Sequence, residues 1–430
     1  MAAYGEFPMA AVTWVRRSAR PAPASMRAGD GVAGRLAAAG TARAEDVLAT
    51  ELDLTPEQEQ LREMCRDFAA GEIAPKADRW WHEERCPTEL FRQMAGLDLM
   101  GLLVPEEYGG TNVSTIAAVA GLYEIGKVDQ SIAAAWQAHL TIGSLPLAVF
   151  GNEDQKQRWL RPLATGEKLG SFGLTEPDAG SDAAGIRTQA TLDDGAWVIN
   201  GSKVFISNAA TDISQGPIIL ARLPNEEGKP RYGNLIVPTG TPGFATGEKM
   251  HGIGWHALDS RELTFTDVRV GEDHLIGQEG RGLSQFLSVL EAGRITVATL
   301  GISLTAAVLD MSLEYARHRQ QFGQPLSKFQ AIQFKLADMA AELEAARLLV
   351  FHAARLRDAG RPHSKECAMA KLVATRLAMR AASEAVQIHG GYGYMHEYPV
   401  SRFFCDAKVL EIGEGTNEIQ HLVIARHLGC

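Results

Sequence analysis

The first part of the chain carries apolar residues at helical spacing. In "LDLTPEQEQLREMCRDFAAGEI", Leu61, Met64 and Phe68 recur every three or four positions. Thr55 is a good N-cap, a proline follows it at the first helical position, and a glutamine three residues on completes a capping box. Similar patterns continue through "IAAVAGLYEIGKV" and "SIAAAWQAHLTIGSLPLAVFG". The pattern predicts an all-helical domain over residues 51–170.

The pattern changes near residue 171. "GPIILARL", "YGNLIVP" and "RELTFTDVRV" combine β-branched residues with alternating apolar and polar positions, which is typical of strands. Asp194-Gly195 and Asn200-Gly201 are dipeptides that favour tight hairpin turns. We therefore predict a compact β domain over residues 171–281, with a hairpin turn at each dipeptide.

The helical spacing returns at Gly282 and continues to the end of the chain. It predicts three long helices and a final segment, "FCDAKVLEIGEGTNEIQHLVIARHL". Long amphipathic helices joined by short loops indicate an antiparallel four-helix bundle over residues 282–430. The predicted fold class is α+β and multi-domain, with an N-terminal all-α domain, a middle β domain and a C-terminal four-helix bundle.

Residues 1–50 differ from the rest, being rich in Ala, Arg, Gly and Pro and poor in acids. One interpretation is a removable transit peptide, which would place the protein in the mitochondrial matrix. The other is a disordered extension of a bacterial cytoplasmic protein. Serine is scarce and prolines interrupt any amphipathic helix, so we favour the extension and a cytoplasmic location.

Composition and charge exclude several classes of protein. The net charge is −10 and no basic stripe stands out beyond the N-terminus, which argues against a nucleic-acid partner. No run approaches the ~18 apolar residues of a membrane span. The five cysteines are odd in number and form no CxxC pair, and the twelve histidines form no HExxH pattern. We expect a reducing compartment, no disulfide framework and no metal site.

A carboxylate between two glycines is the first candidate for chemistry. In "EIGEGTNEIQ", Glu414 lies between Gly413 and Gly415. Because glycine loses the most backbone freedom on folding, two of them around one glutamate suggest that the backbone passes close to something. Glu414 is either a surface charge on a loose turn or a base presented to a ligand, and this loop alone does not decide between them.

Five further stretches have a plain interpretation when taken singly: a polar loop, a half-buried strand, a solvated charge pair, a charged helix end and a helix C-cap. They are "FGLTEPDAGSD", "KVFISNAA", "LEAGRIT", "RHRQQFGQPLSKFQ" and "QIHGGYGY". In this order and spacing, and with the Glu414 loop, the chain from residue 52 to 430 resembles the acyl-CoA dehydrogenase family. The resemblance implies an FAD cofactor and an acyl-CoA substrate.

The resemblance implies one group of residues at the flavin ring. Backbone groups near Phe172 and Leu174 and the hydroxyl of Thr175 would meet the edge of the isoalloxazine. Phe205 would pack beside the ring, and the hydroxyl of Ser207 would reach N5. Many family members have Trp and Thr at the last two positions, and Phe and Ser supply the same apolar face and short hydroxyl.

A second group would hold the pyrophosphate and adenine of an FAD bound to a neighbouring subunit. The resemblance therefore implies at least a dimer, and the family habit is a dimer of dimers. Thr416 and Glu418 match further positions at the FAD phosphate or adenine, where Glu418 would use its backbone because an acid repels pyrophosphate. The residues of the second group are Arg319, Gln321, Phe322, Gln330, Gln387, Gly390 and Gly391.

A third group would bind the substrate. Ser181, Glu291 and Arg294 match contacts to the coenzyme A moiety, and Gly415 lies beside the thioester. Some relatives place their base on the long helix, immediately before the arginine, but this chain has a glycine there. The resemblance thus makes Glu414 the base that takes the α-proton of the acyl-CoA, while flavin N5 accepts the β-hydrogen and a trans-2-enoyl-CoA forms.

The acyl group should meet the helix that carries Ala133, Gln137 and Leu140, which share one face. Glutaryl-CoA dehydrogenases place an arginine near the position of Ala133 to hold a second carboxylate. Alanine cannot pair that charge, so we expect an uncharged acyl chain, short to medium or branched. Gly413 replaces a tyrosine that is common before the base and leaves room there.

Three functions compete at this point. The leading one is an acyl-CoA dehydrogenase that passes electrons to an electron-transfer flavoprotein. The second is an oxygen-using acyl-CoA oxidase. The third is a catalytically silent helical scaffold, against which the intact Glu414, Arg294 and Thr175 argue.

Overall fold

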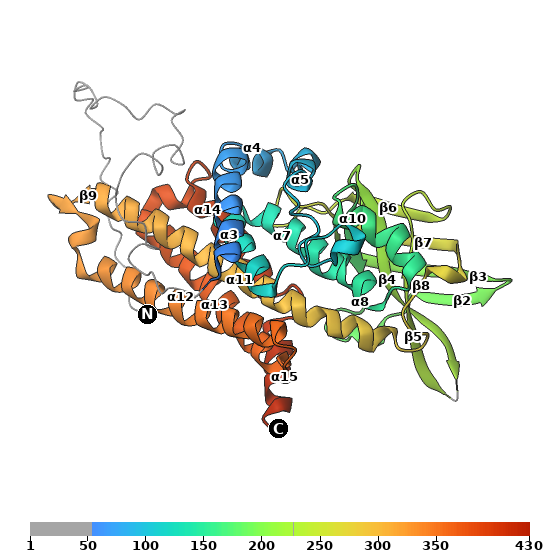
Figure 1. Cartoon of the computed structure of the whole chain (residues 1–430). Coiled ribbons are helices and arrows are strands. Elements are labelled where there is room, and N and C mark those ends of the chain that lie inside the picture. The colour runs from blue at the N-terminus through green and yellow to red at the C-terminus, as the bar shows by residue number, and fades with distance from the viewer. Residues whose placement is uncertain (1–53, 227) are drawn as a thin grey trace, which may run out of the picture. The chain divides into compact units, whose positions relative to one another are not determined.

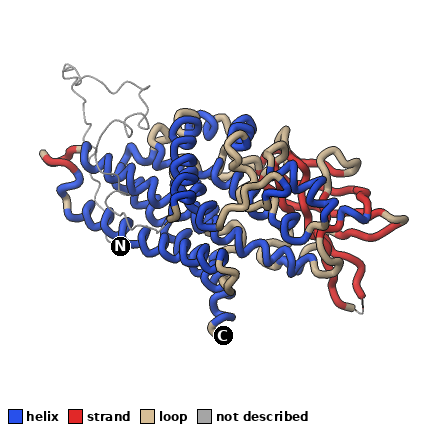
Figure 2. The backbone as a smooth tube through the Cα atoms, in the orientation of Figure 1, coloured by secondary structure: helices blue, strands red, loops and turns tan. Residues whose placement is uncertain are grey.

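The structure, a computed structural model, describes residues 54–226 and 228–430. The two interpretations of residues 1–50 lie outside the described residues. The described part begins with helices, continues as a β sheet and ends in long helices (Figures 1 and 2). This order is the one that the hydrophobic pattern predicts.

The N-terminal part is helical, as predicted. Thr55 caps the first helix, α3, and both hydrogen bonds of the capping box are present. In the part of this domain that the structure describes, three π-helical turns extend neighbouring helices: η1 Ala69–Ile73, η3 His139–Gly143 and η4 Lys156–Leu160. The α-helices are α3 Pro56–Phe68, α4 Ala77–His82, α5 Thr88–Ala95, α6 Thr115–Gly126, α7 Gln130–Ala138, α8 Leu145–Phe150, α9 Glu153–Gln155 and α10 Arg161–Ala164.

Within the described residues the sheet contains eight strands in the order β6-β7-β3-β2-β4-β5-β8, with β1 paired to β4. β1 and β2 run parallel to β4, and the other pairs are antiparallel. The strands are β1 Leu169–Gly173, β2 Gln189–Asp193, β3 Ala196–Ser207, β4 Ser214–Glu226, β5 Lys229–Ile236, β6 Phe244–Lys249, β7 Ser260–Gly271 and β8 Leu275–Ile276.

One of the two predicted hairpin turns is confirmed and the other is wrong. Asp194 and Gly195 connect β2 to β3, both with positive φ. Asn200 and Gly201 instead lie inside β3, at an irregularity in its pairing with β7. The side chain of Asn200 bonds Asp267 of β7, with Nδ2 to Oδ1 at 3.0 Å, and accepts from the Asp267 N–H at 2.8 Å. The dipeptide therefore forms a bulge within one strand, because its polar side chain finds a partner across the sheet.

The C-terminal part consists of α11 Gly282–His318, α12 Gln330–Asp358, α13 Ser364–His389, α14 Pro399–Leu410 and α15 Asn417–His427. α11, α12 and α13 pack along one another. A short hairpin, β9 Gln320–Gln321 with β10 Gln324–Pro325, follows α11. The final segment is not one helix: residues 411–416 separate α14 from α15. That interruption carries Glu414.

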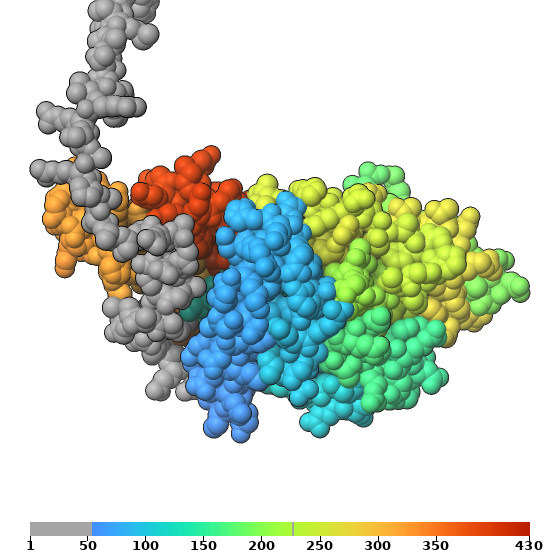
Figure 3. Space-filling view, turned by 90° about the horizontal axis from the view of Figure 1, so that it is seen from above, coloured from blue at the N-terminus to red at the C-terminus, as the bar shows by residue number. Residues whose placement is uncertain are grey.

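Among the described residues, two helical segments are long and apolar enough to cross a membrane, contrary to the expectation that no run approaches this length. They are Gln130–Phe150 and Gly282–His318, and 83% and 89% of their most apolar windows lie buried inside the protein. Such burial is typical of core helices. In the space-filling view the N-terminal helices (blue) pack directly against the β sheet (green) (Figure 3).

Candidate active site

The loop between α14 and α15 makes a sharp left-handed turn. Glu414 has φ 51° and Gly415 has φ 91°, whereas Gly413 has no positive φ. The left-handed region suits glycine but costs an L-residue free energy, so the glycine is needed at 415 and Glu414 is held in a strained conformation. Thr416 then begins α15 as its N-cap, accepting from the Ile419 N–H at 3.4 Å.

The side chain of Glu414 lies against Gly293 of α11 and is hydrogen-bonded to Gln137 of α7. A Cβ atom added to Gly293 would clash with Glu414 Oε2, so the absence of a side chain at 293 makes room for the carboxylate. Gln137 Nε2 donates to Glu414 Oε1 at 2.6 Å and also lies 3.0 Å from the Thr141 and Thr296 hydroxyls. Glu414 Oε2 is buried and has no hydrogen-bond partner within residues 54–226 and 228–430.

The environment of Glu414 suits a base that works near neutral pH. Burial raises its pKa from 4.5 to about 7, against the opposing effects of the Gln137 hydrogen bond and the positive charges of Lys371 and Arg294. A carboxylate with a pKa near the working pH is both ionised in part and basic enough to take a proton. Glu414 is therefore no surface charge on a loose turn.

The three residues predicted to contact coenzyme A, besides Gly415, differ in how deeply they are buried. Arg294 is buried on α11, and its Nε has no hydrogen-bond partner in the described part of the chain. Glu291, three residues earlier, is half-buried, and its carboxylate lies 3.7 Å from His363 Nε2. It is Gly293, and not Glu291, that faces Glu414. Ser181 is exposed, in the loop that follows β1.

The predicted flavin loop is held by an ion pair that the sequence did not reveal. Lys203 of β3 has no exposed side-chain surface, and its Nζ lies 2.7 Å from Glu176 Oε1 and 3.0 Å from the carbonyl oxygen of Leu174. Glu176 also accepts from the Thr188 N–H at 3.0 Å. The Thr175 carbonyl accepts from the Val204 N–H at 2.9 Å. Leu174 and Thr175 are thereby fixed at the end of β1, half-buried.

The groups around this loop fit a flavin ring. Phe205 has φ 62° and leaves 64% of its surface exposed, at an irregularity where β3 pairs with β7. A large apolar side chain held exposed in a strained conformation is a feature that functional sites retain. Ser207 nearby is half-buried and, with Thr175, offers a hydroxyl. Phe172 differs, since its ring is buried and stacks on Phe286 of α11 at 3.2 Å between centroids.

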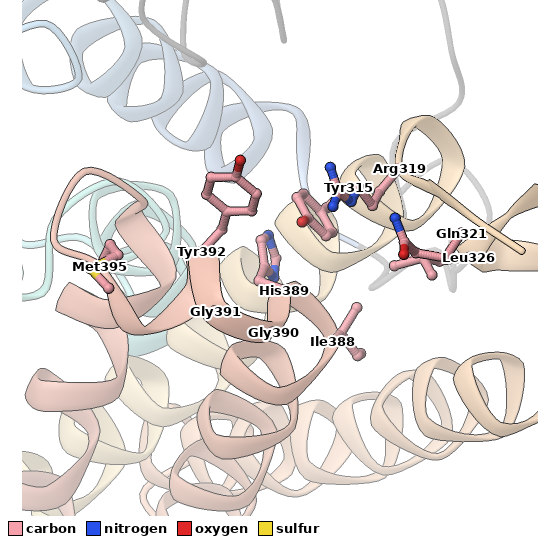
Figure 4. A pocket seen from close by; sticks show the side chains of 10 residues that line it. All are labelled: Tyr315, Arg319, Gln321, Leu326, Ile388, His389, Gly390, Gly391, Tyr392 and Met395. Carbon is pink, nitrogen blue, oxygen red and sulfur yellow. The ribbon is translucent and has the colours of Figure 1, made fainter. Parts of the chain in front are cut away.

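Four residues of the second predicted group line a pocket of about 480 Å³ (Figure 4). They come from the C-cap of α11, from the β9 strand and from η8, a 3-10 helix over Gly390–Tyr394 that follows α13, and they are Arg319, Gln321, Gly390 and Gly391. Tyr392 lies under the Arg319 guanidinium at 5.5 Å. His389 is buried and stacks on Tyr315 at 4.2 Å between ring centroids. A cationic guanidinium beside aromatic rings and glycine backbone suits a nucleotide diphosphate.

The other members of that group do not line the pocket. Phe322 is 94% exposed between β9 and β10, with φ 52°. Gln330 is exposed at the first position of α12, and Gln387 is exposed in the last turn of α13. Glu418 is exposed in the first turn of α15.

The two predicted FAD groups lie at opposite ends of α11. Phe172 packs on Phe286 near the start of this helix, and Arg319 follows its end. The rise of an α-helix places these two points about 50 Å apart. One FAD molecule cannot cover that distance, so one chain does not bring both groups together around a single cofactor.

Sequence reasoning missed several residues that position the site. Lys203, Glu176, Lys371 and Asn417 are buried polar residues of this kind. The available signal was the charge itself, since Lys371 stands in the apolar run "ECAMAKLVATRL". A buried lysine is rarely without a partner, but the sequence alone does not say which loop it contacts.

The fold and the site together define an FAD-dependent oxidoreductase built of a helical, a β and a second helical part. Three family models match the chain in the same order: "Acyl-CoA dehydrogenase, N-terminal domain" over residues 55–167, "middle domain" over 171–268 and "C-terminal domain" over 280–429. The chain belongs to the acyl-CoA dehydrogenase family, whose members are FAD-dependent.

Relatives and solved structures agree with this assignment. "Probable acyl-CoA dehydrogenase YngJ" of Bacillus subtilis is 48% identical over 377 residues, which are 87% of this chain and 99% of the relative. Butyryl-CoA dehydrogenase from Megasphaera elsdenii has a TM-score of 0.85 and 39% identity, covering 88% of this chain and 99% of its own. An acyl-CoA dehydrogenase from Bacillus anthracis in complex with FAD has a TM-score of 0.83 and 31% identity. The match covers 88% of this chain and 68% of the B. anthracis chain.

Proposed function

We propose that this protein removes hydrogen from Cα and Cβ of an uncharged acyl-CoA to give a trans-2-enoyl-CoA, with Glu414 as the base, and passes the electrons to an electron-transfer flavoprotein. The observation that carries the proposal is the Glu414 carboxylate, buried against Gly293 with a pKa of about 7. The location we propose is the bacterial cytoplasm, which the B. subtilis relative supports.

Glu414 has the properties that the first bond cleavage requires. An α-proton next to a thioester is a weak acid, so the base must be strong and close. Burial makes the Glu414 carboxylate more basic than an exposed one, and the strained turn aims it at the gap beside Gly293. The Cα–H bond breaks as the proton moves to Glu414, and its electron pair forms the Cα=Cβ double bond as hydride leaves Cβ with the electron pair of the Cβ–H bond.

The same loop offers a donor for the enolate oxygen that develops. The backbone N–H of Glu414 has no hydrogen-bond partner among the described residues. A free N–H in a rigid turn stabilises negative charge without reorganisation. When bound, FAD supplies the two-electron acceptor for the hydrogen that leaves Cβ, and Leu174, Thr175, Phe205 and Ser207 are the residues that would hold its ring.

The acyl chain that fits is uncharged. Ala133 on α7 is fully buried and offers no charge to a second carboxylate. Gln137, on the same helix, uses its amide on Glu414 and two threonines. Burying an unpaired carboxylate there would cost several kcal/mol. The solved relative that acts on butyryl-CoA supports a short uncharged substrate.

The two halves of the FAD site support an assembly in which each cofactor bridges two chains. The pocket around Arg319 and the loop around Thr175 are too far apart for one cofactor within one chain. In the proposed dimer, each chain supplies the pocket for the FAD whose ring lies on its partner. A dimer of dimers is the larger assembly that we propose.

A titration of the purified protein with a panel of acyl-CoAs, followed by its visible spectrum under anaerobic conditions, tests the proposal. We expect a yellow oligomer with one FAD per chain, bleached by butyryl-, isobutyryl- or octanoyl-CoA and poorly by glutaryl-CoA. A preference for glutaryl-CoA in kcat/KM would refute the argument from Ala133. Hydrogen peroxide formed in air at the turnover rate would identify an acyl-CoA oxidase instead.

A further inference from the structure

Lys371, in the middle of α13, is buried completely and forms no ion pair with a carboxylate in the part of the chain that the structure describes. A buried ammonium group is costly unless hydrogen bonds and nearby negative charge compensate for it. The proposed chemistry of the site gives this lysine no role. The groups around its Nζ therefore indicate what the charge does.

The Nζ of Lys371 holds the loop that carries Glu414. It donates to the carbonyl oxygen of Gly415 at 2.9 Å and to Asn417 Oδ1 at 3.3 Å. The Gly415 carbonyl also accepts from Gln420 Nε2 at 2.7 Å, and Asn417 Oδ1 accepts from the Thr375 hydroxyl at 3.0 Å. Both acceptor positions of the Gly415 carbonyl are thus occupied, one from α13 and one from α15.

The hydrogen bond from Lys371 to the Gly415 carbonyl lies at the strained part of the backbone. Glu414 and Gly415 are both left-handed, with φ 51° and 91°. A left-handed L-residue costs about 1–2 kcal/mol and persists only where the surroundings over-determine it. The bond from Lys371 fixes the peptide unit one residue beyond Glu414. It therefore helps to keep the carboxylate aimed at Gly293.

The charge of Lys371 also opposes the charge of the base. The charged groups that face Lys371 are Glu414 and Glu411 in the loop, Arg294 on α11 and Glu418 on α15. Glu414 contributes the largest of these interactions, and Lys371 in turn contributes more than Arg294 to the stability of the ionised Glu414. The two groups are therefore coupled, although no direct ion pair joins them.

We propose that Lys371 is a positioning residue for the dehydrogenation: it ties the Glu414 loop into its left-handed turn and supplies buried positive charge opposite the Glu414 carboxylate. This inference rests on the proposed function of Glu414 as the base. Lys371 acts through the loop, since its hydrogen bonds go to Gly415 and Asn417 and not to Glu414 itself.

The test is the pH dependence of flavin bleaching by butyryl-CoA, measured anaerobically in stopped flow for wild type, Lys371→Met and Lys371→Arg. Loss of a nearby positive charge raises the pKa of a carboxylate, so the acid limb of the rate profile in Lys371→Met should move up by about one pH unit. At pH ~7 the ionised fraction of Glu414 then falls about fivefold and bleaching slows by the same factor, approaching about tenfold below pH ~6, with KM changed less than kcat. Lys371→Arg keeps the charge and should return the limb toward its wild-type position.

Thr375→Val is the matched control. It removes a hydroxyl that bonds Asn417 in the same cluster and leaves the charge in place, so its acid limb should coincide with that of wild type. An unshifted acid limb in a folded, FAD-containing Lys371→Met protein overturns the inference. So does failure of both Lys371→Met and Lys371→Gln to fold, which would make the lysine purely structural. A wild-type flavin that no acyl-CoA bleaches would instead refute the proposed function, a result that needs no variant.

Discussion

Two loops of the proposed site are each held by a buried lysine. We call the segment after β1 that carries Leu174 and Thr175 the flavin loop, and residues 411–416 the base loop. Only one of the two lysines has a carboxylate partner among the described residues. Lys203 donates to the Leu174 carbonyl and pairs with Glu176 at 2.7 Å, whereas Lys371 donates to the Gly415 carbonyl and has no ion pair in the described residues. Burial lowers the pKa of both lysines to about 8. The paired lysine would make a fixed surface for the cofactor. The unpaired one leaves its charge to act on Glu414, whose ionisation has to change during the proposed reaction.

The base loop should show the largest effect on rate. Glu414→Gln is nearly isosteric, so the fold, FAD and acyl-CoA binding should survive while flavin reduction falls by ~10⁴ or more, at the upper end for a positioned base. Anaerobic bleaching and the dissociation constant for acyl-CoA measure the two properties separately.

Glu291→Gln is the control for that substitution, because a base on the long helix is the rival assignment. It should mainly weaken coenzyme A binding and raise KM. Bleaching abolished in Glu291→Gln but nearly normal in Glu414→Gln would mean that the base has been misassigned.

The flavin loop should show the largest effect on stability. Lys203→Met leaves Glu176 buried without its partner, which typically costs about 3–5 kcal/mol and should also lower FAD retention. In the double variant Lys203→Met/Glu176→Gln no charge is left unpaired, so most of the loss should be recovered. Thermal midpoints and FAD content per chain test this. A double variant no more stable than the single one would show that the pair is not the cause.

The base loop should in turn make stability depend on pH. Because the pKa of Glu414 is raised from 4.5 to about 7, the folded protein holds a proton that the unfolded chain has released between these values. The contribution of this proton to the free energy of unfolding is fully present below pH 4.5. It is lost as the pH rises through about 7, and the loss amounts to up to ~3 kcal/mol. Glu414→Gln lacks this loss, so its Tm relative to wild type should be higher at pH ~8 than at pH ~5. An equal difference at both pH values would contradict the buried, raised-pKa description.

A methyl group added at Gly293, opposite Glu414, should have the smallest effect of these substitutions on the rate of flavin bleaching. In Gly293→Ala the new Cβ pushes Glu414 Oε2 aside, and a misplaced base should slow bleaching about tenfold without loss of FAD. Gly413→Ala is the matched control, since a Cβ there meets only the Val409 carbonyl at an ordinary 3.5 Å. Equal rates in both variants would mean that the gap at 293 is not where the base works.

Much of the fold could be predicted because the spacing of apolar residues along the sequence distinguishes long helices from strands. The loop that carries Glu414 could also be predicted, because two glycines flank one glutamate there, but its left-handed conformation at 414 and 415 could not. The bulge at Asn200 was mistaken for a hairpin because its partner, Asp267, is distant in sequence. Glu414 was found from its flanking glycines and Gln137 from the helix face that it shares with Ala133, whereas Lys203 and Lys371 depend on contacts that no local pattern encodes.

The length of α11 has a genetic consequence under the proposed assembly. Each complete site draws its base and flavin loop from one chain and its pocket around Arg319 from another. A chain with Glu414→Gln and a chain with Arg319→Ala would each be inactive alone, yet a mixed dimer would contain one site with both parts intact. Two loss-of-function alleles would then complement each other, and co-expression of the two chains should restore activity that neither homo-oligomer has. No recovery from verified mixed dimers would show that each chain completes its own site.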